Sequence, residues 1–222
     1  MEKNRYRIIR SPRRTRIALR IAADGAVEIA APANVPQAVL DEFCHDDHPL
    51  IKRLLERAAS LVKPPELKFE EDALFWLLGK EYPLHLSNRA RIFDGSRFVV
   101  PRGSEEDIRS ALELLYRELA QSYFTKRMKV LSERTGVAPE ALRISSTSGR
   151  WGSRSSSGTI ALSWKLLQCP AEVVDYVICH ELAHILEMNH SPKFWRVVEK
   201  FCPDYRRLRV ELVRFSRRLP VW

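Results

Sequence analysis

The hydrophobic pattern of the chain changes near residue 102, from the alternation typical of strands to the longer period of helices. Over residues 5–31, apolar side chains alternate with polar ones on both sides of Asp24-Gly25, a dipeptide typical of tight hairpin turns. A helical pattern covers residues 36–63, and strand-like pieces follow it. Residues 1–102 are therefore predicted to form a mostly antiparallel β region with one helix.

The remainder of the chain, residues 103–222, is dominated by helical spacing. A capping-box sequence at Ser104-Glu105-Glu106-Asp107 opens a long apolar stripe. Two short strand-like runs, at residues 142–144 and 159–164, precede a helix that is expected to follow Pro170. The fold class is therefore predicted to be α+β, with a C-terminal helical domain that contains a small sheet.

Composition and cysteine usage exclude several classes of protein. Of the 222 residues, 45% are hydrophobic and 29% are charged, which is enough apolar material for a core and excludes a disordered chain. No apolar run is long enough for a signal-peptide core or a membrane span, and the four cysteines lack Cys-x-x-Cys spacing. We therefore expect a cytoplasmic protein with reduced thiols and no membrane partner.

The formal net charge of +9 is concentrated at the two ends of the chain. Residues 1–20 contain eight Lys or Arg and one Glu, and residues 201–222 contain six Arg, one Asp and one Glu. If these ends meet in the fold, they form a basic surface suited to an anionic partner, such as nucleic acid or a nucleotide.

A His-Glu-x-x-His pattern occurs at His180-Glu181-Leu182-Ala183-His184, within the helix expected after Pro170. Side chains four residues apart on a helix point the same way, so both imidazoles can reach one metal ion. Glu181 is turned aside and can reach a water on that metal. The pattern therefore predicts a metal site with a base beside it, and a catalytic zinc would need one more protein ligand.

Two residues are candidates for the third ligand. Glu187 lies on the same helical face, but three ligands from one straight helix would be strung along its axis. His190 is better placed if the helix ends near Met188 and the chain turns at Asn189, a residue type that tolerates the left-handed conformation. Ser191-Pro192 supports such a turn, because the residue before proline is disfavoured in helical conformation. We expect His190 to complete a zinc site, with another divalent metal as the alternative cofactor.

Several motifs occur together in the chain: Arg10-Ser11-Pro12-Arg13-Arg14-Thr15, Arg150-Trp151-Gly152-Ser153, Gly158-Thr159-Ile160-Ala161-Leu162, Asp175-Tyr176-Val177, the His-Glu-x-x-His pattern and Asn189-His190-Ser191-Pro192-Lys193-Phe194-Trp195. In combination they resemble the YgjP-like metallopeptidase family, which is related to the SprT and WLM zincins. The resemblance implies a zincin-like C-terminal domain with zinc on His180, His184 and His190. It also implies that Glu181 is the catalytic acid/base. Two residues depart from the family pattern: the resemblance implies Cys where Arg154 stands and Asn where Ser163 stands.

Further residues near the expected site are candidates for substrate binding. Tyr205 and Arg150 carry groups that can stabilise an oxyanion, and Trp151 and Ser163 belong to the loop and the strand beside the site. The segment Cys44-His45-Asp46-Asp47-His48 also holds metal-capable side chains, but no suitable partner cluster occurs elsewhere in the sequence. A solvated polar face is the better interpretation of that segment.

The expected reaction is zinc-dependent hydrolysis of peptide bonds in a peptide or protein substrate, with a metal-bound water as nucleophile and Glu181 as general base. If the strand at residues 159–164 lies at the edge of its sheet, an extended substrate can pair with it. Two alternatives stay open. One is a metal-dependent phosphoanhydride hydrolase that acts on nucleotides, like a nucleoside triphosphate pyrophosphatase. The other is a basic nucleic-acid-binding module with a structural metal.

Overall fold

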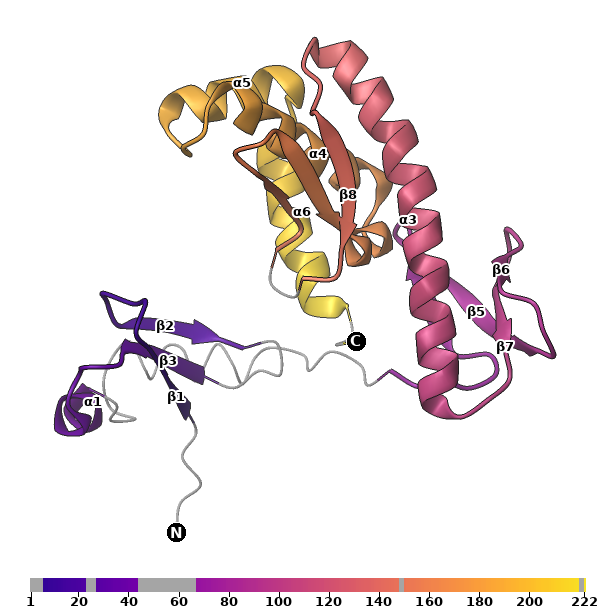
Figure 1. Ribbon diagram of the computed structural model, residues 1–222, viewed down its shortest axis with the longest axis horizontal. Helices are drawn as coiled ribbons and strands as arrows, with labels where there is room; N and C mark the ends of the chain where they lie inside the picture. Colours follow the sequence, from indigo (N-terminus) through magenta and orange to yellow (C-terminus); the bar gives the residue numbers. More distant parts are fainter. Residues whose placement is uncertain (1–5, 23–26, 44–66, 148–149, 220–221) are drawn as a thin grey trace. The chain divides into compact units, whose positions relative to one another are not determined.

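The structure is a computed structural model, which describes residues 6–22, 27–43, 67–147, 150–219 and 222 (Figure 1). Contacts within the chain divide it into two compact units, one formed by Met1–Leu67 with Ser216–Trp222 and the other by Lys68–Phe215. This division falls between residues 67 and 68, whereas the domain boundary near residue 102 stays a prediction.

The first unit contains a small mixed sheet and a short helix. Its elements are β1 (Tyr6–Ser11), β2 (Ala18–Ile21), β3 (Val27–Pro32) and α1 (Gln37–Phe43). Strand β3 is central, antiparallel to β2 and parallel to β1. The side chains of Ile29, Ala31 and Leu40 are fully buried in its core. The predicted strands are therefore confirmed, whereas Asp24-Gly25, the later part of the predicted helix and the Cys44–His48 segment lie outside the described residues.

The second unit contains a mixed sheet formed before residue 102 and a three-stranded sheet formed after it. The first has the order β4-β5-β7-β6, with β4 (Leu74–Leu77), β5 (Lys80–Ser87), β6 (Ile92–Phe93) and β7 (Phe98–Pro101). The second has the order β8-β10-β9, with β8 (Ala141–Ser145), β9 (Gly152–Arg154) and β10 (Thr159–Ser163). Both sheets combine one parallel pair with antiparallel pairing.

The helices of this part follow the start and stop signals in the sequence. They are α3 (Glu105–Thr135), the 3-10 helix η1 (Trp164–Gln168), α4 (Ala171–Leu186), α5 (Pro192–Phe201) and α6 (Tyr205–Arg218). Ser104 and Asp107 form the predicted capping box at the start of α3, and left-handed Gly136 ends it. The α+β class is therefore confirmed. Within the described residues, no helix combines the length and the apolar character that crossing a bilayer requires.

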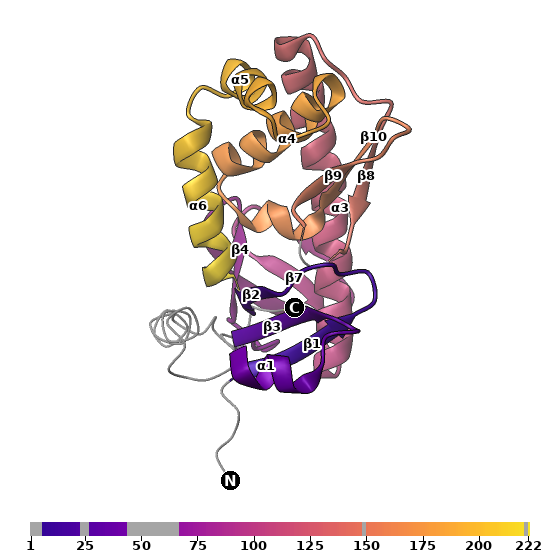
Figure 2. The same cartoon turned by 90° about the vertical axis from the view of Figure 1, so that its left-hand side faces the viewer.

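Helix α3 joins the two sheets of the second unit, because it contacts both β7 and β8 (Figures 1 and 2). Tyr116, near its middle, is fully buried between the rings of Phe98 and Trp164, with centroid distances of 5.0 and 5.5 Å. Further along, Arg127 donates two hydrogen bonds to the carboxylate of Asp175 on α4, at 2.9 and 2.6 Å. The long helix therefore fixes the position of α4 relative to both sheets.

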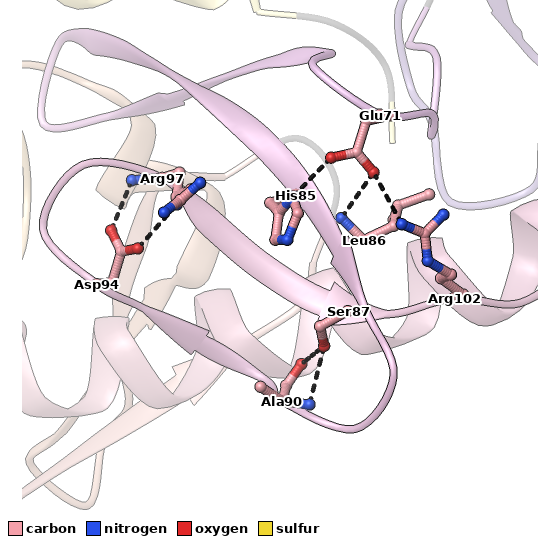
Figure 3. A network of polar contacts seen from close by, with 8 residues as sticks. All are labelled: Glu71, His85, Leu86, Ser87, Ala90, Asp94, Arg97 and Arg102. Atoms are coloured by element: carbon pink, nitrogen blue, oxygen red, sulfur yellow. Dashed lines mark hydrogen bonds and ion pairs between the residues drawn. The ribbon is translucent and has the colours of Figure 1, made fainter.

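A cluster of polar contacts secures the ends of β5 and β7 (Figure 3). The carboxylate of Glu71 lies 2.6 Å from His85 Nδ1, accepts a hydrogen bond from the Leu86 N–H at 3.1 Å and lies 3.8 Å from Arg102. The Leu86 N–H is the main reason that the pKa of Glu71 is lowered. Asp94 accepts hydrogen bonds in the turn before β7 in the same way. These contacts fix the loops and strand ends of the β4-β5-β7-β6 sheet, just before the chain enters α3.

The turn between β4 and β5 packs against the start of α4. Its two residues, Leu78 and Gly79, both have positive φ, as tight hairpin turns require. Their N–H groups donate to the carbonyl oxygens of Leu167 and Gln168, at 2.8 and 3.2 Å. A Cβ on Gly79 would lie only 3.0 Å from the Cα of Pro170, the N-cap of α4. The turn therefore needs glycine for its conformation and for this close approach.

Replacing Gly79 with alanine is expected to lower the free energy of unfolding by about 1–3 kcal/mol, because the methyl group strains the backbone and pushes the turn away from Pro170. Urea denaturation would measure the change. Gly95→Ala is the matched control, since Gly95 also has positive φ but its Cβ would meet nothing within 4 Å. An equal loss in both variants would show that the contact with Pro170 contributes nothing.

Candidate metal centre

Helix α4 carries the first two histidines of the site in a largely buried setting. Most of its side chains are buried, and it packs against α3, α5 and β9. His180 and His184 lie one turn apart, so their rings project from the same face, with centroids 4.9 Å apart. The sequence spacing therefore brings these two imidazoles together as predicted.

His190 joins them from the segment between α4 and α5. The chain leaves α4 at Glu187, whose φ of −139° is extended, and α5 begins after Ser191, whose hydroxyl caps the helix by accepting from the Phe194 N–H. Asn189 does not have positive φ, so the predicted left-handed turn at this residue is wrong. The chain is extended at Glu187 and Ser191, and it bends at Met188 and Asn189 without a residue of positive φ.

The three histidines form a group that can hold one metal ion. One ring nitrogen from each of His180, His184 and His190 lies within 4.8 Å of the others. The Nε2 atoms of His180 and His190 are 3.1 Å apart. Two nitrogens that bind one tetrahedral zinc at about 2.0–2.1 Å lie about 3.3 Å apart, so this pair is close to ligand spacing. Glu187, the alternative third ligand, is not part of the group.

Contacts around the rings fix their orientation. The Nδ1 atom of His184 lies 3.2 Å from the backbone oxygen of Glu187, which leaves Nε2 for a metal. The ring of Phe194 stacks on His184 at 4.4 Å, and Trp195 stacks on His190 at 5.9 Å. Aromatic side chains from the first turn of α5 thus form a wall beside the site.

The surroundings keep two imidazoles in the neutral form that binds a metal. Burial lowers the pKa of His180 to about 3, and the nearby His184, His190 and Arg209 add to the effect. The pKa of His184 is also lowered, again mainly by burial. Nδ1 of His180 is buried without a hydrogen-bond partner, so the ring gains nothing from protonation at that atom.

Glu181 lies beside the histidines and is almost fully buried, with 5% of its surface exposed. Burial raises the pKa of this carboxyl group to about 7. The carboxyl group faces β9, because a Cβ on Gly152 would lie 2.6 Å from Oε1 of Glu181. Gly152 belongs to the Arg150-Trp151-Gly152-Ser153 motif, but nothing in a single sequence shows that its missing side chain makes room for Glu181.

The sheet beside α4 presents β9 as an edge, not the strand expected from sequence. β10, which corresponds to the predicted strand at residues 159–164, lies between β8 and β9, so the expectation that it lies at an edge is wrong. Trp151 O accepts from Ser163 N, and Ser155 N donates to Thr159 O. In antiparallel pairing, residues whose N–H and C=O groups face the partner strand alternate with residues whose groups face away from it. Trp151 and Ser155 are bonded toward β10, so the backbone groups of Gly152 and Arg154 point away from β10. Strand pairing of this kind depends on contacts that local sequence patterns do not encode.

The remaining predicted site residues have different surroundings. Arg150 is exposed, and Trp151 is partly exposed beside β9. Ser163 is buried at the end of β10, where it also precedes η1. Tyr205 is buried and stacks on Trp195 at 5.4 Å, so one aromatic ring separates it from His190. A role for these four residues in substrate binding stays a prediction.

A family model and two solved structures match the chain. The family model described as YgjP-like, metallopeptidase domain, matches residues 15–215. The metallopeptidase zymogen abylysin of Pyrococcus abyssi is 26% identical, with 44% of this chain and 98% of that chain covered and a TM-score of 0.39. The metallopeptidase zymogen jannalysin of Methanocaldococcus jannaschii is 17% identical, with 41% of this chain and 95% of that chain covered and a TM-score of 0.38. No curated protein sequence matches the chain. Since the family model spans most of its length, the chain belongs to the YgjP-like metallopeptidase family and is, at the level of that family, a metal-dependent hydrolase.

Proposed function

We propose that the chain is a zinc-dependent peptidase in which His180, His184 and His190 hold the metal. The observation that carries this proposal is the convergence of three imidazole nitrogens within 4.8 Å from α4 and the segment after it. Three histidines suit a catalytic zinc, because they leave the fourth position of a tetrahedral site open. The chemistry that a bound zinc supplies there is Lewis acidity, which polarises a carbonyl group and makes water more acidic.

Glu181 is the proton carrier of the proposed reaction. Its Oε1 atom takes a proton from the water that attacks the substrate carbonyl, and it then passes that proton to the leaving amine. Two observations support this role. The side chain is adjacent in sequence to a metal-binding histidine and is held in one place by burial against Gly152. It is also outside the group of metal-binding atoms, so its oxygens stay available.

The substrate is proposed to be an extended peptide that pairs with the outer edge of β9. The outward N–H and C=O groups of Gly152 and Arg154 offer the hydrogen bonds that such a strand needs. Because Gly152 contacts Glu181, a peptide on this edge passes beside the carboxyl group. The edge strand therefore orients the peptide, and Glu181 transfers the proton from water to the leaving amine.

Removal of the metal tests the proposal. We expect purified protein to contain about one zinc per chain and to cleave peptides, and 1,10-phenanthroline to abolish cleavage until zinc is restored. The metal-free protein should also melt at lower temperature, because a ligand that binds only the folded state stabilises it. Elemental analysis, mass spectrometry of peptide products and thermal melts measure these results.

Two other outcomes contradict the proposal. Release of phosphate from nucleoside triphosphates, with a preference for magnesium or manganese and without peptide cleavage, would favour the phosphoanhydride hydrolase. Tight nucleic-acid binding that falls steeply with salt and is unaffected by Glu181→Gln would favour the binding module with a structural metal.

A further inference from the structure

Arg154, the last residue of the edge strand β9, points its side chain toward the candidate metal centre. Residues two apart on a strand face the same side, and the missing side chain of Gly152 would point at Glu181. Arg154 therefore lies on the same side as Glu181. Its Nη1 atom is 2.8 Å from the sulfur of Met188, just beyond α4. Burial is the main reason that the pKa of His184 is lowered, and the charge of Arg154 contributes to it.

No carboxylate among the described residues pairs with Arg154. Its Nε atom is buried without a hydrogen-bond partner, and the Met188 thioether is only a weak acceptor. Other arginines of this unit have such partners, as Arg127 has in Asp175 and Arg207 has in Glu172. An arginine with no acidic partner beside an active site leaves its donors for an anion that is not part of the described chain.

A substrate peptide paired with β9 can supply the anion for Arg154 from one of its own side chains. A peptide on the outer edge of β9 places one of its residues directly opposite Arg154, with its side chain on the same face. Directly opposed side chains on neighbouring antiparallel strands lie about 4.5–5.5 Å apart at Cβ, and opposite charges stabilise such pairs. The residue opposite Gly152, which is beside Glu181, is two positions away along the same peptide.

We propose that Arg154 makes the enzyme selective for peptides that carry an aspartate or glutamate about two residues from the cleaved bond. The inference rests on the proposed peptidase function. The guanidinium group binds the acidic side chain through charge-assisted hydrogen bonds, for which its fork of donors is suited. With antiparallel pairing the acidic residue lies on the amino-terminal side of the residue opposite Gly152.

The test compares peptides that differ at one position. Each peptide carries Asp or Glu, or the matching Asn or Gln, at one place near the cleaved bond, and kcat/KM is measured by mass spectrometry. Wild type is expected to prefer the acidic peptide about fivefold to tenfold at one position. Arg154→Gln should abolish the preference, Arg154→Lys should retain part of it, and Arg154→Glu should transfer it to peptides with Lys or Arg there.

The matched control is Arg143→Gln, which removes the same charge from β8, at the opposite edge of the sheet. It should leave the preference intact. Peptides with free and amidated carboxyl ends form two parallel sets, because a terminal carboxylate could satisfy the same donors. A preference that exists only for the free carboxyl end would overturn the proposal, as would an acidic preference that survives Arg154→Glu.

A binding measurement separates this inference from the proposed function. In the Glu181→Gln background, fluorescence anisotropy compares a labelled peptide that carries Asp or Glu with the same peptide carrying Asn or Gln at that position. We expect the Asn or Gln peptide to bind about fivefold more weakly, and this difference to vanish when Arg154→Gln is added. If wild type cleaves no peptide, the proposed function fails, and the anisotropy result alone then decides whether Arg154 selects acidic peptides. Equal binding of both peptides would overturn the inference even if cleavage is observed.

Discussion

Replacing Glu181 with glutamine is expected to reduce kcat/KM for peptide hydrolysis by about 10²- to 10⁴-fold, while zinc content stays at the wild-type level. Glutamine has nearly the same shape, so it keeps the packing against Gly152, but it cannot take up and release a proton. The three imidazoles proposed to hold the metal are unchanged by this substitution. Steady-state kinetics together with elemental analysis would measure both quantities on the same preparation.

Glu187→Gln is the control for this variant, because it makes the same chemical change six residues further along the chain. The backbone carbonyl that contacts His184 is retained, and the Glu187 side chain is outside the group of histidines proposed to hold the metal. Both activity and zinc content should therefore stay close to wild type. If Glu187→Gln lost its zinc, the ligand set would be wrong, and if Glu181→Gln remained fully active, another group would have to carry the proton.

Replacing Gly152 with alanine should lower kcat/KM by about 10- to 100-fold with the metal retained, because the added methyl group competes with Glu181 for space. The new Cβ would lie 2.6, 2.8 and 2.9 Å from Oε1, Cγ and Cδ of Glu181, all closer than carbon contacts allow. Since Glu181 is buried, either its carboxyl group or β9 has to shift. We also expect a loss of about 1–3 kcal/mol in the free energy of unfolding.

Ser153→Ala provides the comparison for Gly152→Ala, since Ser153 belongs to the same short strand but its side chain faces the other side of the sheet. It should leave kcat/KM within about twofold of wild type. Kinetics, zinc content and urea denaturation would be measured for both variants. Wild-type kinetics in Gly152→Ala would mean that the position of Glu181 does not limit the reaction.

Features that depend on neighbouring residues could be predicted from the sequence. The capping box at Ser104 is confirmed, because it depends on a local hydrogen-bond preference. The left-handed Gly136 and the Ser191 cap are local features of the same kind. The pairing of His180 with His184 follows from helical geometry in the same way.

Features that depend on distant segments could not be predicted. The sequence identifies the strand at residues 159–164 but not its central place between β8 and β9, because strand order is set by long-range contacts. The sequence predicts that His190 joins His180 and His184, yet the chain bends at Met188 and Asn189 without the expected left-handed Asn189. The role of Gly152 depends on a neighbour 29 positions away in the chain, and no local pattern encodes that contact.

The contact of the β4–β5 turn with the start of α4 bears on how short an active fragment can be. The turn supplies the N–H groups that satisfy Leu167 and Gln168, immediately before the helix that carries His180 and His184. A fragment that begins at residue 103 would lose these donors and would uncover Tyr116 where Phe98 now covers it. Residues 68–101 therefore support the helix that carries His180 and His184, and the shortest fragment that folds by itself and keeps the candidate site is expected to begin near Lys68.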